Sequence, residues 1–227
     1  SKTSYTVGAS VTIEELRQLL KKKYPDFSEL LRRYGSMQVR NAATLGGNIA
    51  NGSPIGDSPP ALIALGASII LNQGGEHRKI PIENFFLKYG VQDRQPGEFI
   101  ESIEIPKTES NLKCYKISKR FDQDISAICG CFSVTFTKNK VKTARIAFGG
   151  MAEIPKRAVL TETSLIGRVW SDETISHAMK ELDKDFNPIS DLRASAEYRK
   201  LTAKNLLKKY YLEVKALETN TDVLRVV

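Results

Sequence analysis

A glycine pair with polar neighbours is the part of the chain best suited to holding a ligand. Gly46 and Gly47 carry no Cβ, so the backbone there can adopt φ > 0 and approach a ligand closely. Consecutive N–H groups in such a turn form a concavity for anionic or hydroxyl oxygens. Asn48 adds an amide and Asp57 a carboxylate of the kind that binds sugar hydroxyls. The alternative is a tight turn that needs the glycines for its own geometry.

Side-chain catalysis has few candidates in this sequence. The 227 residues include three cysteines and two histidines, all scattered. This scarcity argues against a zinc site, which usually takes four Cys or His ligands, and against a hydrolase built on histidine. Three cysteines also cannot form a paired disulfide framework, so we expect a reducing compartment, the cytoplasm. Any chemistry here is expected to need a cofactor.

Composition narrows the choice of partners. The chain is 41% hydrophobic and 26% charged, and its net charge of +8 is scattered rather than clustered. We therefore expect no nucleic-acid partner. The longest apolar stretch, Ala61 to Leu71, is far shorter than the roughly 20 residues of a membrane span, so no membrane partner is expected either.

The elements around the glycine pair alternate between helix and strand. Residues 4–9 predict a strand, and Thr12 with Glu15 forms a capping box that begins a helix ending near Pro25. Ser28 is predicted to cap a second helix that stops at Gly35. Residues 36–60 fit neither the helical nor the strand period, which is typical of a functional loop. A short helix is expected to follow, with Pro59 and Pro60 at its start and residues 61–65 in its body.

The rest of the chain predicts hairpins and then helices. Residues 67–71 pair with 79–82, and further strands are expected at 99–105, 114–119, 128–137 and 141–148. In the strand over 128–137, Ile128, Phe132 and Val134 are expected on one face and the packing residues Cys129 and Cys131 on the other. Helices are predicted near 157–166, 173–182 and 192–215, with a loose tail from residue 218.

The segment around the glycines resembles the flavin-binding segment of the molybdenum hydroxylases. The carrying stretch is RNAATLGGNIA at residues 40–50, followed by SPIGD at 53–57. Within that family the segment looks most like the xanthine dehydrogenases. Similar stretches follow in family order along the chain: SIEIP at 102–106, YK at 115–116, IS at 125–126, FGGMA at 148–152, PKRA at 155–158 and SDLRASAEYR at 190–199.

The resemblance implies an α+β fold in two parts. Residues 1–107 would be the second half of a vanillyl-alcohol-oxidase-type FAD-binding domain. Residues 108–227 would be a domain like the C-terminal domain of the carbon monoxide dehydrogenase flavoprotein, with an antiparallel sheet plus helices. The family's first FAD subdomain, with its diphosphate loop, has no counterpart here. We expect it to be truncated or on another polypeptide, and this part alone to bind FAD weakly or not at all.

The resemblance also implies a function. The chain would be the FAD-binding part of a xanthine dehydrogenase small subunit, passing electrons from molybdenum and [2Fe–2S] centres through FAD to NAD during hypoxanthine and xanthine oxidation. The expected partners are an iron–sulfur domain and a molybdenum-binding subunit, because three cysteines here cannot ligate a cluster. The alternatives are the flavin subunit of an aldehyde, carbon monoxide or aromatic acyl-CoA hydroxylase, and a non-catalytic subunit-docking module.

No side chain is expected to be catalytic or to bind a metal, because hydride transfer belongs to the cofactor. The resemblance assigns FAD contacts to these residues: Tyr34, Thr44, Leu45, Gly46, Gly47, Asn48, Asp57, Ile100 and Lys116. Lys116 would place a positive charge beside the reduced flavin.

Each side-chain assignment has a plainer alternative. Lys116 would then be a solvated lysine, Tyr34 helix-end packing and Ile100 strand core. The charged loop that follows, residues 119–124, is expected to border the nicotinamide side of the flavin.

Overall fold

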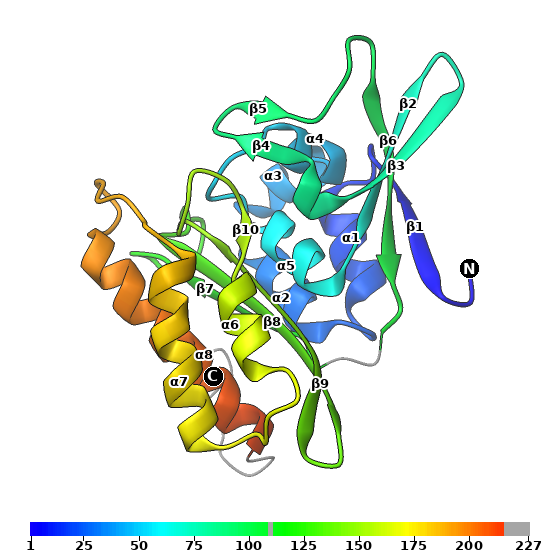
Figure 1. The fold of residues 1–227 in the computed structure, drawn as a ribbon. Coiled ribbons are helices and arrows are strands. Elements are labelled where there is room, and N and C mark those ends of the chain that lie inside the picture. Colours follow the sequence, from blue (N-terminus) through cyan, green and yellow to red (C-terminus); the bar gives the residue numbers. More distant parts are fainter. Residues whose placement is uncertain (109–110, 216–227) are drawn as a thin grey trace.

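Two four-stranded antiparallel sheets and eight α-helices make up the part of the chain that the computed structural model describes, residues 1–108 and 111–215 (Figure 1). The predicted tail from residue 218 lies outside these residues. The first sheet has the strand order β1-β6-β2-β3 and the second the order β10-β9-β8-β7, and a small hairpin joins β4 to β5.

The elements of the first half are, in chain order, β1 (Ser4–Gly8), α1 (Ile13–Leu20), α2 (Pro25–Arg32), α3 (Met37–Ala42), α4 (Leu45–Ala50), α5 (Ser58–Leu65), β2 (Ser68–Gln73), β3 (Glu76–Pro81), a 3₁₀ turn (Ile82–Asn84), β4 (Phe86–Lys88), β5 (Val91–Gln92) and β6 (Phe99–Pro106). Those of the second half are β7 (Lys113–Ile117), β8 (Ile128–Thr137), β9 (Lys140–Gly149), β10 (Lys156–Arg157), α6 (Val159–Leu165), α7 (Asp172–Asp185) and α8 (Ala196–Lys215).

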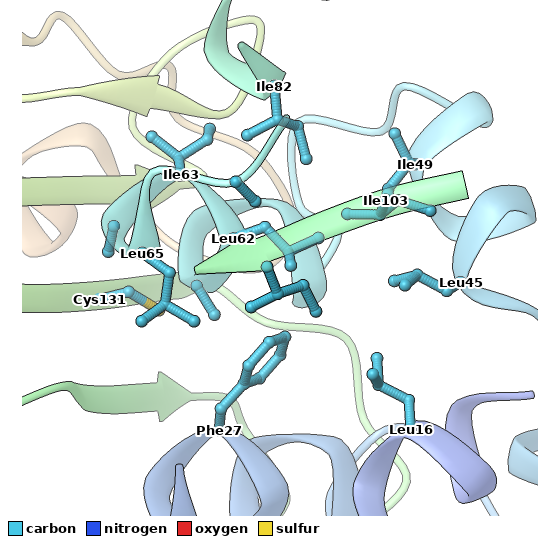
Figure 2. Packing of buried hydrophobic residues seen from close by; sticks show 14 of the residues in the cluster. Leu16, Phe27, Leu45, Ile49, Leu62, Ile63, Leu65, Ile82, Ile103 and Cys131 are labelled. Atoms are coloured by element: carbon cyan, nitrogen blue, oxygen red, sulfur yellow. The ribbon is translucent and has the colours of Figure 1, made fainter. Parts of the chain in front are cut away.

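Helix α5 lies between the two sheets and holds them together. Every residue of this helix is buried, because its sequence SPPALIAL presents apolar side chains all round. One side contacts β8 and β9, and another contacts β6. Figure 2 shows Leu62, Leu65 and Phe27 with Cys131 of β8 in this one cluster. The first core therefore continues onto the second sheet, and the boundary between residues 107 and 108 stays a prediction.

The second sheet buries both of its faces. The alternation predicted for β8 is confirmed: Cys129 and Cys131 face the α5 side, while Ile128, Phe132 and Val134 belong to a separate core. That second core is completed by α7 and α8, and Tyr210 of α8 stacks on Phe132 with ring centroids 5.2 Å apart.

Several predicted boundaries are wrong for local reasons. Helix α2 begins at Pro25, so Ser28 lies inside it, and its hydroxyl donates to the Arg17 carbonyl instead of capping. Helix α8 begins at Ala196 rather than residue 192, after a turn in which the Asp191 carboxylate accepts the N–H groups of the next turn residues. Strands β4, β5 and β10 were not predicted, because two or three residues show no period.

The segment 36–60 is not an irregular loop, since it contains α3 and α4. Gly46 and Gly47 do not adopt the positive φ that glycine allows, because both residues lie in α4, which the Thr44 hydroxyl caps. The predicted N–H concavity is also absent from these residues. The Gly46 N–H donates to the Ala9 carbonyl and the Gly47 N–H to the Thr44 hydroxyl, while those of Leu45 and Asn48 donate to backbone carbonyls.

Close packing explains why residue 46 is a glycine. A Cβ on Gly46 would lie 2.5 Å from the Ala9 Cβ and 2.9 Å from the Ala9 carbonyl oxygen, whereas a Cβ on Gly47 would meet only the Thr44 hydroxyl at 3.0 Å. Gly46 is needed for helix packing against the turn after β1, and Gly47 is not.

None of the helices in the described part of the chain combines the length and the apolar character that crossing a membrane requires.

The two glycines give a matched test of this packing. We expect Gly46→Ala to lower the free energy of unfolding by about 1–3 kcal/mol, because the added methyl displaces the backbone at Ala9. Gly47→Ala should change it by less than about 1 kcal/mol, because helix propensity offsets crowding at Thr44. Urea unfolding of both variants measures the difference. Equal losses would contradict the packing explanation.

Acid should weaken the contact between α1 and the last turn of α3. Arg17 and Arg40 hold the pKa of Glu14 at about 2, below its usual 4.5. Because the folded-state pKa is depressed, this stabilisation is present above pH 4.5 and is lost as the pH falls towards 2. We expect Glu14→Gln to reduce the difference in the free energy of unfolding between about pH 6 and about pH 3, measured by urea titration. Glu153→Gln, at an exposed loop position, should retain the wild-type difference.

Candidate flavin-binding cleft

A cleft of about 350 Å³ opens between the end of α2, the segment from α4 to α5, and the loop between β7 and β8. Four residues predicted as flavin contacts line it: Tyr34, Asn48, Asp57 and Lys116. They come from both halves of the chain, and the fold brings them together around one opening.

A buried ion pair forms the floor of this cleft. The Lys116 ammonium donates to one Asp57 carboxylate oxygen at 2.5 Å, and the Ser126 hydroxyl donates to the other at 2.5 Å. Lys116 is 6% exposed, Asp57 5% and Ser126 1%. The alternative of a solvated lysine is therefore excluded. Such a buried pair is maintained only when its polar atoms have partners. Ser126 supplies the partner of the second Asp57 oxygen.

A second polar chain lies beside it. The Asn48 amide nitrogen donates to the Tyr34 hydroxyl at 3.3 Å, and the Ser58 hydroxyl donates to the Asn48 amide oxygen. Both Asn48 and Tyr34 keep part of their surface in the cleft. Their hydrogen bonds fix the amide and the ring before any ligand arrives, which lowers the entropy cost of binding.

The other predicted contacts lie away from the opening. Leu45 and Gly46 are buried in α4, and Ile100 lies in β6 opposite Leu71, within the first core. Thr44 is half-buried and Gly47 exposed at the start of α4. Contact of these five residues with a cofactor stays a prediction.

The loop between β7 and β8 borders the cleft through Gln123, Asp124 and Ile125. Gln123 has φ +53°, a left-handed conformation that costs a non-glycine residue about 1 kcal/mol. The Arg120 and Ile125 N–H groups donate to Asp124 and hold the pKa of its carboxyl below the usual range. This part of the loop is therefore a fixed wall of the cleft.

Arg33 supports the same loop from behind. Its guanidinium donates to the carbonyls of Phe121 and Lys116 and lies 4.5 Å from the centre of the Phe121 ring. Neither Arg33 nor Ser126 was predicted as a site residue. Arg33 is the C-cap of α2, next to Tyr34, and only the fold shows that its side chain crosses to β7.

The cleft fits a flavin nucleotide. It combines an aromatic ring, an amide and a fixed ammonium–carboxylate pair, groups suited to a planar ring system and to hydroxyls. Lys116 and Asp57 would lie against the bound group, with Tyr34 and Asn48 at its side. No side chain in this set is arranged as a nucleophile with a neighbouring base.

Comparisons with known proteins identify the two domains of the chain. Residues 1–108 match the FAD binding domain in molybdopterin dehydrogenase, and residues 113–214 match the CO dehydrogenase flavoprotein C-terminal domain. The chain is 30% identical to the glyceraldehyde dehydrogenase medium chain of Sulfolobus acidocaldarius, covering 92% of this chain and 75% of that protein. It is 35% identical to the xanthine dehydrogenase of Dictyostelium discoideum, covering 92% of this chain but only 18% of that protein.

The fold agrees as well. A carbon monoxide dehydrogenase from Hydrogenophaga pseudoflava superposes with a TM-score of 0.85 at 25% identity, covering 91% of this chain and 73% of that chain. The expected α+β fold, an FAD-binding domain followed by a carbon monoxide dehydrogenase flavoprotein C-terminal domain, is confirmed. The chain belongs to the molybdenum hydroxylase family, as an FAD-binding flavoprotein component.

Proposed function

We propose that the chain is the FAD-binding part of a xanthine dehydrogenase that uses NAD as electron acceptor in the cytoplasm. Its partners are an iron–sulfur domain and a molybdenum-binding subunit. The observation that carries the proposal is the buried Lys116–Asp57 pair in a cleft shared by both halves of the chain. Three free, buried cysteines support a reducing compartment.

Bound FAD would supply the electron-transfer chemistry that links iron–sulfur centres to NAD. We assign its contacts to the nine residues predicted from the sequence, with the cleft residues Tyr34, Asn48, Asp57 and Lys116 supported by their position. Asp57 and Asn48 offer acceptors to hydroxyls, and Tyr34 offers a ring face. Lys116 holds a positive charge at the floor of the cleft, and Ser126 orients the carboxylate that neutralises part of it.

A second candidate is the flavin subunit of an aldehyde-type molybdenum hydroxylase. The 75% coverage of the glyceraldehyde dehydrogenase medium chain supports it. Carbon monoxide and aromatic acyl-CoA hydroxylases remain alternatives with the same cleft. A non-catalytic docking module is the third, and it predicts no flavin reduction.

Reconstitution with the molybdenum and iron–sulfur subunits separates these candidates. Flavin bleaching on addition of xanthine supports the first, and bleaching by glyceraldehyde but not xanthine supports the second. Assembly without flavin reduction by any substrate would support the docking module.

Replacing the buried lysine should affect the flavin more than the assembly. We expect Lys116→Met to lower the midpoint potential of bound FAD by about 30 mV or more, because a cation that stabilises the reduced ring is removed. Lys119→Met, at a nearby exposed position, should leave it within about 10 mV of wild type. Spectroelectrochemical titration of the holoprotein measures both.

In Lys116→Met the Asp57 carboxylate stays buried without its ammonium partner, which costs about 3–5 kcal/mol of stability. The double variant Lys116→Met with Asp57→Asn should recover most of that loss in urea unfolding. An unchanged potential in a stably folded Lys116→Met variant would contradict the assigned position of the flavin.

The loop next to the cleft should influence the acceptor. Asp122 is exposed and pairs with Arg32 at 3.5 Å, while Asp124 lines the cleft. We expect the double variant Asp122→Asn with Asp124→Asn to change the rate of NAD reduction at least about fivefold, because removing both charges alters the loop that borders the nicotinamide side.

FAD content, measured from the visible absorbance, should stay close to wild type in this variant. Asp183→Asn, on α7 and also exposed, serves as the control. Unchanged NAD kinetics, or an equal effect on the reduction of an artificial dye, would count against a role of this loop in acceptor access.

A further inference from the structure

A second cavity, of about 360 Å³, lies between α2, β7 and α8. Cys114, Tyr115, Ile117, Phe121 and Leu206 give it mostly apolar walls. Its size lies within the range of small-molecule sites in proteins. Lys116 borders both this cavity and the flavin-binding cleft, but the two openings otherwise have different linings.

The cavity runs along the free edge of the second sheet. Strand β7 is the last strand in that sheet, and consecutive residues from Cys114 to Ser118 line the cavity. The Lys116 carbonyl points away from β8, because it accepts a hydrogen bond from Arg33 at 2.9 Å. In an antiparallel ladder, backbone groups alternate in direction along the strand. The N–H groups of Cys114 and Lys116 therefore point from the edge towards the cavity.

Every charged side chain in the lining already has a partner within the chain. Asp26 pairs with Lys113, and Glu213 accepts the Tyr115 hydroxyl at 2.7 Å. Lys209 also pairs with Glu213, and Lys116 with Asp57. Arg33 donates to two carbonyls and to the Ser118 hydroxyl. A charged ligand would gain no free counter-ion here, so the cavity favours a neutral one.

The walls favour a flat ligand. Tyr115 is 9% exposed, and its ring lies beside Lys209, whose ammonium is 5.4 Å from the ring centre. Phe121 is 52% exposed at the opening, yet Arg33 holds its ring from behind. Two aromatic rings and an aliphatic wall from Leu206 match the faces of a planar ring system.

We propose that this cavity is a binding site for a neutral, planar, mainly apolar molecule with one hydrogen-bond acceptor, such as a ring carbonyl. The acceptor receives the outward N–H groups of β7, and the ring lies among Tyr115, Phe121 and Leu206. An extended peptide fits less well, because Arg33 already occupies the Lys116 carbonyl that a pairing strand needs. The site is independent of FAD and goes beyond the proposed function.

Coumarin, which is neutral and planar with one carbonyl, is the probe. We expect titration of the ¹⁵N-labelled chain to shift the Cys114 and Lys116 amide signals downfield in a saturable way, because both N–H groups gain an acceptor. Naphthalene, which lacks an acceptor, should enter without shifting these amides downfield. Scattered or non-saturable shifts with coumarin would overturn the proposal.

Variants on α8 give the matched comparison. Leu206→Trp fills the cavity and should weaken coumarin binding at least about tenfold, whereas Leu201→Trp, at an exposed position on the same helix, should stay within about twofold of wild type. Equal binding by both variants would overturn the proposal. If Leu206→Trp does not fold, the comparison of coumarin with naphthalene in the wild-type chain decides the question.

Discussion

The buried contact between Asp57 and Lys116 is the interaction on which the cleft depends. Asp57 precedes α5 in the first half of the chain, and Lys116 lies in β7 of the second. Burying two charges costs several kcal/mol per ion unless their polar atoms find partners, and Ser126 provides one for the second Asp57 oxygen. The pair therefore forms only when both halves are folded and in register, so cleft geometry and overall packing are coupled.

Helix α5 explains why the halves stay in register. It is apolar on most sides, and it fills the space between the first sheet and the Cys129–Cys131 face of the second sheet. Polar contacts near its C-terminal end also orient the helix, because Arg145 of β9 donates to the Ile63 carbonyl and to Glu83. A helix buried in this way cannot shift without opening cavities in the first core. Asp57 is therefore held in place as well, because it lies at the N-terminal end of this helix.

Strand β7 serves two surfaces of the molecule. Its Lys116 side chain lines the candidate flavin-binding cleft, while its backbone edge faces the apolar cavity between α2 and α8. Arg33 connects the two, because it binds the Lys116 carbonyl and the base of the loop that borders the cleft. Polar atoms that would otherwise be unpaired at a sheet edge are thus used to fix the loop.

The sequence by itself determined the family, the α+β class, the capping box at Thr12 and the two faces of β8, because local periods and motifs carry these features. It also predicted Tyr34, Asn48, Asp57 and Lys116, which the structure places around one cleft. Only the tertiary structure decided that Gly46 packs under Ala9 and that Lys116 pairs with Asp57. It alone revealed Ser126 and Arg33 as supports. These features depend on contacts between segments far apart in the chain, and no local pattern encodes such distances.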